Sequence, residues 1–206
     1  KRTSLITVAD MCRKIEESSI SLPLYQRDIS WTLQKCIDLL NYQLWGKAPV
    51  SPISINVINT VDNAVPQVSF IDREIIAAIE RGQYSVVDGQ QRLTTNYKAY
   101  CNHDDFRNIV LDLGKGEFAE VRDSIRSNQI PVGILLNKED AKLFEYTKTK
   151  SALGSADVLS VLLQVRSKMR NYNYTLNSAE DLTEDEQIEW FEVLNNAGSR
   201  VSIIQM

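Results

Sequence analysis

One short segment, residues 86–95, brings together side chains that could bind and act on a phosphate. Its sequence is Val-Val-Asp-Gly-Gln-Gln-Arg-Leu-Thr-Thr. Arg92 carries a planar guanidinium that can donate paired hydrogen bonds to phosphate oxygens, and Asp88 could hold a Mg²⁺ ion through water. Further donors and acceptors are the side chains of Gln90, Gln91, Thr94 and Thr95. This combination predicts a site for a phosphate or a carboxylate.

The elements around this segment would hold those side chains at the end of a helix. Residues 84–87 include an aromatic residue and two β-branched valines without a breaker, which predicts a strand, and residues 91–101 have helical spacing of apolar positions. The turn between them is Asp88-Gly89, and Gly89 would let a ligand approach the backbone. A helix that begins directly after a tight turn presents unpaired N–H groups and a partial positive charge. The spacing also fits an alternative: Asp88 as an ordinary helix N-cap, with Arg92 solvated on the surface.

Residues 88–95 resemble the signature of the GmrSD-type restriction-enzyme N-terminal domain family, whose fold is similar to that of ParB and sulfiredoxin. Residues 22–31, Leu-Pro-Leu-Tyr-Gln-Arg-Asp-Ile-Ser-Trp, resemble the family's opening motif, although Ile29 stands where an aromatic residue is usual. A third motif of the family is matched by Phe191, Asn195, Gly198, Val201 and Ser202. The three motifs follow in the family's order and span nearly the whole chain.

The resemblance implies a nucleotide-binding domain, which could also hydrolyse nucleoside triphosphates, in a modification-dependent restriction or phage-defence system. Asp88 and Arg92 would be the catalytic residues, with Mg²⁺ held at Asp88. The partners would be a nucleoside triphosphate, DNA that could be modified, and a nuclease domain or partner protein outside this chain. The nucleotide would be bound by Gly89, Gln90, Gln91, Thr94 and Thr95, together with Tyr25, Gln26, Arg27 and Asn195.

Two other functions fit the same residues. In the first, the chain is a DNA-sensing module without catalysis, in which the turn binds a phosphate of the DNA backbone. In the second, it is a metal-dependent nicking nuclease that uses Asp88 together with Asp72 or Glu74.

Composition limits the classes of protein. The chain has 206 residues, 43% of them hydrophobic and 24% charged, as in an ordinary soluble globular domain. No apolar run is long enough to cross a bilayer, so we expect a cytoplasmic protein without a membrane partner. The net charge of −4 argues against a globally basic nucleic-acid binder, although residues 166–174 interleave cations with aromatics. A single histidine excludes a His-Asn-His nuclease or a histidine-rich zinc site, and the three cysteines suit buried free thiols.

The order of predicted elements favours an α+β fold: a small mixed, ParB/sulfiredoxin-like sheet with flanking helices and a helical C-terminal extension. We expect a mixed lobe over residues 1–150 that carries the Asp88 turn, and a helical extension over residues 151–206. Because the chain begins at Lys1 and stops soon after its third motif, we expect it to be a fragment. The predicted helices cover residues 7–17, 31–45, 72–81, 91–101, 138–148, 156–171 and 183–196, and the predicted strands cover 21–24, 52–58, 68–71, 84–87, 108–113 and 130–136.

Overall fold

The computed structural model describes residues 1–28 and 30–205 and has a mixed α+β fold, as the sequence predicts. A six-stranded sheet has the order β1-β9-β3-β5-β2-β4, and a separate three-stranded sheet has the order β7-β6-β8. The larger sheet is mixed, because β3 runs parallel to β9 and β2 parallel to β5, whereas its other pairs are antiparallel. Its strands are β1 (Arg2–Thr7), β2 (Ile20–Pro23), β3 (Ile53–Ile58), β4 (Gln67–Val68), β5 (Gln83–Asp88) and β9 (Asn173–Glu180).

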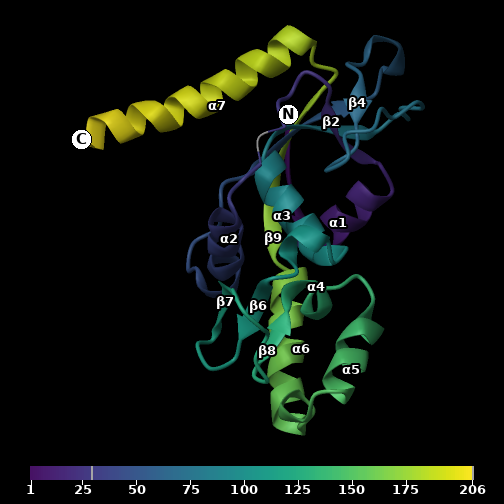
Figure 1. Ribbon diagram of the computed structural model, residues 1–206. Coiled ribbons are helices and arrows are strands. Elements are labelled where there is room, and N and C mark those ends of the chain that lie inside the picture. The colour runs from purple at the N-terminus through teal and green to yellow at the C-terminus, as the bar shows by residue number, and fades with distance from the viewer. Residues whose placement is uncertain (29, 206) are drawn as a thin grey trace.

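Two helices cover one face of the larger sheet (Figure 1). They are α1 (Val8–Glu16) and α3 (Gln90–Tyr100). The apolar side of α1 and Leu93 of α3 pack against Ile53, Ile55 and Val86 in one buried cluster. Burial of such side chains stabilises the fold by about 1.5–3 kcal/mol each. This packing fixes α3 against the strand that leads into it.

A second buried cluster lies beneath the smaller sheet. There α2 (Leu33–Trp45) and α6 (Ala156–Arg170) pack with the short strands and helices of residues 109–148 (Figure 1). These short elements are β6 (Ile109–Asp112), β7 (Glu117–Glu120), β8 (Gln129–Pro131), α4 (Val132–Leu135) and α5 (Asp140–Lys148). Beyond β9, α7 (Glu184–Gln205) projects away from the body of the molecule (Figure 1).

Side chains cap the starts of α1 and α7. The hydroxyl of Thr7 accepts a hydrogen bond from the backbone N–H of Asp10, 3.1 Å away, and caps α1. Thr183 and Glu186 form a reciprocal capping box before α7: the Thr183 N–H donates to Oε1 of Glu186 at 3.0 Å, and the Glu186 N–H donates to Oγ1 of Thr183 at 3.2 Å. Cys12 and Cys36 are buried free thiols, as expected, whereas the free thiol of Cys101 is only partly buried. Burial raises the pKa of the Cys12 thiol, which keeps it protonated and unreactive.

The helix predicted over residues 72–81 is wrong. Ile71 and Arg73 take positive φ angles of 68° and 52°, and the chain there turns back so that Ile75 bridges Val68 of β4. The strand predicted over residues 130–136 is correct only at its start, because the chain turns into the short helix α4 directly after Pro131.

The end of the chain also differs from expectation. Residues 173–180, within the predicted helical extension, form the strand β9, which pairs with both β1 and β3. The segment after residue 151 is therefore not wholly helical, although α6 and α7 lie in it. The end of the helix predicted over residues 183–196 is wrong as well, since α7 continues to Gln205.

Candidate nucleotide-binding site

The predicted turn joins β5 directly to α3. Gly89 is the N-cap residue of α3 and has φ +116° and ψ 7°, a conformation that glycine adopts without strain. A Cβ atom at this position would lie 2.4 Å from Cδ1 of Ile53, a core residue of β3. Both the backbone angle and the close packing therefore require glycine here.

The first turn of α3 offers free backbone donors. No side chain caps the helix at Gly89. The first backbone bond is donated by Leu93 N–H to the Gly89 carbonyl, at 3.1 Å. Among the described residues, the N–H groups of Gln90, Gln91 and Arg92 have no acceptor in the protein. Together with the helix dipole, these three donors could hold an anion.

Arg92 and Asp88 form an ion pair across this turn. Nη2 of Arg92 lies 3.6 Å from Oδ2 of Asp88, and their side chains are 13% and 30% exposed. The guanidinium also donates hydrogen bonds to the backbone carbonyls of Ser51 and Pro52, just before β3. Arg92 is therefore not simply solvated on the surface: it fastens the start of α3 to the entry of β3.

A cavity of about 180 Å³ runs along the side of α3. Four of the predicted binding residues line it, namely Gln90, Gln91, Thr94 and Thr95, whereas Asp88, Gly89 and Arg92 do not. Its lining also includes Trp31, Cys36 and Ile71, and the polar residues Asp28, Ser30, Lys98 and Asp105. The structure therefore places the two glutamines and Thr94 of the motif along one cavity beside the helix. Thr95 is only 2% exposed, and its hydroxyl donates to the Gln91 carbonyl at 2.8 Å.

Lys98 is a lining residue that the sequence does not single out. Its side chain is 16% exposed, and Nζ lies 2.9 Å from Oδ2 of Asp105. The hydrogen bond from Lys98 holds the pKa of the Asp105 carboxyl below its usual value. Lys98 follows Gln91 by seven residues, about two helical turns, so both lie on the cavity side of α3. That spacing within the helix could have identified Lys98.

The opening motif reaches the turn through Gln26. Its side-chain amide donates hydrogen bonds to the carbonyls of Val86 and Val87, at 3.0 and 2.8 Å, immediately before Asp88. Tyr25 donates its hydroxyl proton to Oε1 of Gln187 on α7, at 3.2 Å, and burial raises the pKa of Tyr25 to about 12. Arg27 is exposed and does not line the cavity. The first two motifs thus meet at the end of β5.

The third motif is not brought to the turn. Asn195 is exposed on α7, and its amide donates to the carbonyl of Phe191 in the same helix, at 2.7 Å. It does not line the cavity beside α3. Gly198 and the side chains of Val201 and Ser202 have surroundings that lie outside the described part of the structure. A binding role for Asn195 stays a prediction without a contact to support it.

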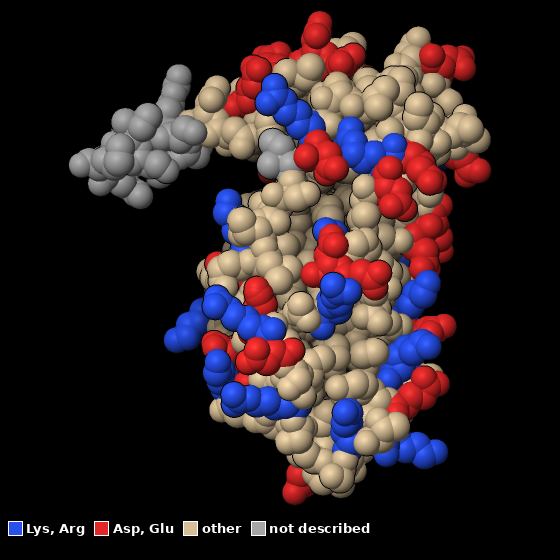
Figure 2. Space-filling model, in the orientation of Figure 1, with Lys and Arg blue, Asp and Glu red and all other residues tan. Residues whose placement is uncertain are grey.

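The cations of residues 166–170 are occupied within the fold. Arg166 is buried and donates to the Leu135 carbonyl and to Asp140, at 2.8 and 2.6 Å. Lys168 lies over the ring of Trp45, and Arg170 over the ring of Tyr100. On the face shown in Figure 2, basic and acidic side chains are intermixed. This segment therefore packs α6 rather than forming an open basic stripe.

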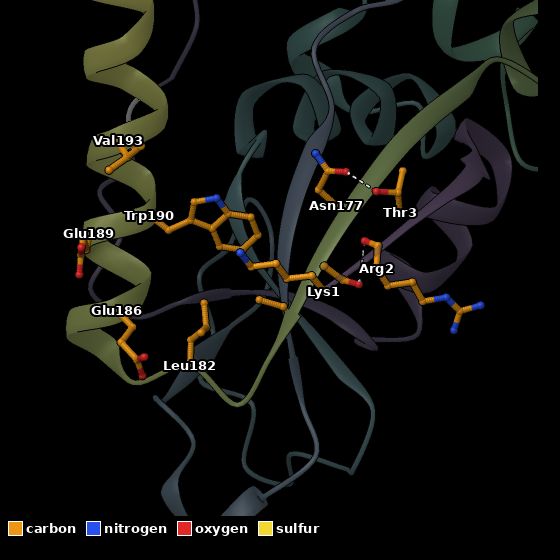
Figure 3. A pocket seen from close by; sticks show the side chains of 11 residues that line it. Lys1, Arg2, Thr3, Asn177, Leu182, Glu186, Glu189, Trp190 and Val193 are labelled. Carbon is orange, nitrogen blue, oxygen red and sulfur yellow. Dashed lines mark hydrogen bonds between the residues drawn. The ribbon is translucent and has the colours of Figure 1, made fainter.

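A larger cavity of about 620 Å³ lies between α7 and the ends of β1 and β9 (Figure 3). Trp190 and Val193 of α7 face Thr3 and Asn177 of the strands across it. None of the predicted binding residues lines this cavity.

The residues that the structure describes do not form a metal-binding cluster. They contain no group of three or more His, Cys, Asp or Glu side chains that could hold a metal ion. Asp72 and Glu74, the acids of the nicking alternative, do not line the cavity beside α3. No helix in the described chain has the length and apolar character needed to cross a bilayer.

Comparison with known families gives a match over nearly the whole chain. The family described as GmrSD restriction endonuclease, N-terminal domain, matches residues 8–204. No curated protein matches the chain. The match includes all three motifs identified in the sequence.

Proposed function

Because this chain belongs to the GmrSD restriction endonuclease N-terminal domain family, and is thus a component of a restriction and phage-defence system, we propose that it binds a nucleoside triphosphate at the start of α3. The family implies DNA as the target of the system and a nuclease domain as a partner. The nucleotide site is inferred from the geometry of the Asp88 turn and of the cavity beside it.

The observation that supports the proposal most strongly is a set of unpaired backbone N–H donors next to a cavity lined by polar side chains. Three backbone N–H groups at the first turn of α3 have no acceptor among the described residues. The adjoining cavity adds the amides of Gln90 and Gln91, the Thr94 hydroxyl and the Lys98 ammonium, although Lys98 is paired with Asp105 and the carboxylates of Asp28 and Asp105 also line the cavity. Phosphate oxygens accept hydrogen bonds from donors of this kind at a helix N-terminus. At about 180 Å³ the cavity holds part of a nucleotide, so the remainder would lie outside it.

Arg92 would act from a fixed position. Its contacts with two backbone carbonyls hold the guanidinium at the turn, where its charge favours phosphate without any rearrangement. If hydrolysis follows binding, this fixed charge would stabilise the negative charge that develops on the transferred phosphoryl group. Asp88, which is 30% exposed, would orient the attacking water or a metal ion.

The residues present fit a Mg²⁺ ion that arrives with the nucleotide. Mg²⁺ commonly binds one or two carboxylates together with substrate phosphates and water. Asp88 can supply one carboxylate, whereas a resident all-protein metal site would need a cluster that the described residues lack. When bound, the ion would neutralise phosphate charge. Asp88 would hold it at the end of β5.

Isothermal titration with Mg²⁺ and ATP, GTP, CTP or UTP tests the proposal, using wild type, Asp88→Asn and Gln91→Ala. We expect one or more triphosphates to bind wild type and to bind both variants more weakly. Binding that is unchanged in both variants would place the nucleotide elsewhere. If no triphosphate binds and DNA binds with a steep dependence on salt, the DNA-sensing alternative replaces this proposal.

A further inference from the structure

Arg73 lies far from the cavity in sequence but contacts the loop that carries Tyr25 and Gln26. Its Nη2 donates hydrogen bonds to the carbonyl of Gln26 at 2.8 Å and to that of Leu24 at 3.2 Å. These two carbonyls flank Tyr25. A single guanidinium therefore fixes the backbone on both sides of that residue.

The loop held in this way is tied in turn to the Asp88 turn. The Gln26 amide donates to the last two carbonyls before Asp88, and the Tyr25 hydroxyl donates to Gln187 of α7. A connected series of hydrogen bonds thus runs from Arg73, through the loop, to the end of β5. Movement of the loop would release the Gln26 contacts next to Asp88.

The backbone conformation of Arg73 is further support for a role in holding this loop. Its φ of +52° lies in the left-handed region, which is unfavourable for a non-glycine residue. The neighbouring Ile71 also has a positive φ, of 68°. Strained backbone of this kind persists where the surrounding contacts compensate for it. At Arg73 these contacts are its hydrogen bonds to the loop.

Two buried polar atoms of this series lack a partner among the described residues. They are Nη1 of Arg73, which is a donor, and Oε1 of Gln26, which is an acceptor. Buried polar atoms are nearly always paired with protein or with ordered water.

We propose that Arg73 is a positioning residue for the nucleotide site: it clamps the Tyr25-Gln26 loop so that Gln26 holds the end of β5 and the Asp88 turn in place. This inference rests on the proposed nucleotide site. It adds to that site a residue that neither contacts the cavity nor belongs to any of the three motifs.

The test compares Arg73→Ala with Arg81→Ala, since Arg81 is an exposed arginine of the same connection. We expect Arg73→Ala to weaken binding of the Mg²⁺–triphosphate that wild type binds by roughly tenfold, as loss of a charged hydrogen bond does. Hydrogen exchange should accelerate in the peptide that contains residues 22–28. Arg81→Ala should change neither quantity.

A double-mutant cycle separates positioning from a general loss of stability. If Arg73 acts through Gln26, Arg73→Ala in a Gln26→Ala background should weaken nucleotide binding by less than twofold. Arg73→Lys, which keeps the charge and part of the hydrogen bonding, replaces Arg73→Ala if the latter does not fold. Fully additive effects, or wild-type affinity in Arg73→Ala, would overturn the proposal.

Hydrogen exchange in the loop can be measured without a nucleotide, so it tests the role of Arg73 separately from the proposed nucleotide site. If no triphosphate binds wild type, the nucleotide site is wrong and Arg73 cannot position it. Faster exchange in Arg73→Ala would then show a loop clamp without that role. Exchange equal to that of Arg81→Ala would refute the clamp itself.

Discussion

Replacing Gly89 with alanine should destabilise the protein by two separable effects. The first is backbone strain, because φ +116° is unfavourable for a residue with a Cβ atom and costs about 1–3 kcal/mol. The second is overpacking, because the new Cβ would lie 2.4 Å from Cδ1 of Ile53. Forced repacking in a dense core costs about 1–3 kcal/mol. The expected loss in the free energy of unfolding is therefore about 2–6 kcal/mol, the sum of the two ranges.

Gly82 supplies the matched control. It also has a positive φ, of 93°, but a Cβ atom there meets nothing within 4 Å. Gly82→Ala should therefore show the backbone cost alone. The difference between the two variants in the free energy of unfolding estimates the cost of the contact between the new Cβ and Ile53.

The measurement is urea unfolding at 25 °C for both alanine variants and for Gly89→Ala combined with Ile53→Val. Because valine lacks Cδ1, the double variant should recover part of the extra loss seen in Gly89→Ala. Equal stability of Gly89→Ala and Gly82→Ala would refute the packing argument. If Gly89→Ala were as stable as wild type, residue 89 could have neither the positive φ angle nor the close contact with Ile53 described here.

Two further predictions concern charged groups. Arg92→Lys should lower the free energy of unfolding by about 1–2 kcal/mol, since an ammonium cannot keep the geometry of both carbonyl hydrogen bonds; an unchanged thermal midpoint would contradict this. The hydrogen bond from Gln129 lowers the pKa of the Asp112 carboxyl below its usual value of 3.8. The ionised carboxylate therefore stabilises the folded protein fully above the unfolded-state pKa, and this stabilisation is lost as the pH falls through the folded-state pKa. The stability difference between wild type and Asp112→Asn should therefore be largest above about pH 5 and should shrink below pH 3.8; a difference that grows on acidification would contradict this.

Local patterns predicted the part of the site that lies within one segment. A β-branched strand, a glycine turn and a helical spacing identified β5, Gly89 and α3, because these signals depend on neighbouring residues. The contact between Gln26 and β5 followed only from the family resemblance, which placed both motifs in one site. Asn195 shows the limit of that approach, since its amide is satisfied within α7.

Other features depend on contacts between distant residues. β9 alternates buried Tyr174 and Leu176 with polar residues, but its partners in β1 lie about 170 positions away. Residues 72–81 have isoleucines at helical spacing, yet positive φ angles at Ile71 and Arg73 turn the chain. The role of Arg73 rests on carbonyls 47 and 49 residues away, which no spacing in the sequence indicates.

The central claim is that phosphate binds at the first turn of α3, and Gln91→Glu tests it most directly. A carboxylate in the first turn of a helix favours the helix by about 0.3–1 kcal/mol, so the variant should fold at least as well as wild type. Lining the cavity, the same carboxylate would repel phosphate. Titration with Mg²⁺ and the triphosphate that wild type binds should therefore show at least tenfold weaker binding to a protein of equal or higher thermal stability. Wild-type affinity in Gln91→Glu would contradict the account.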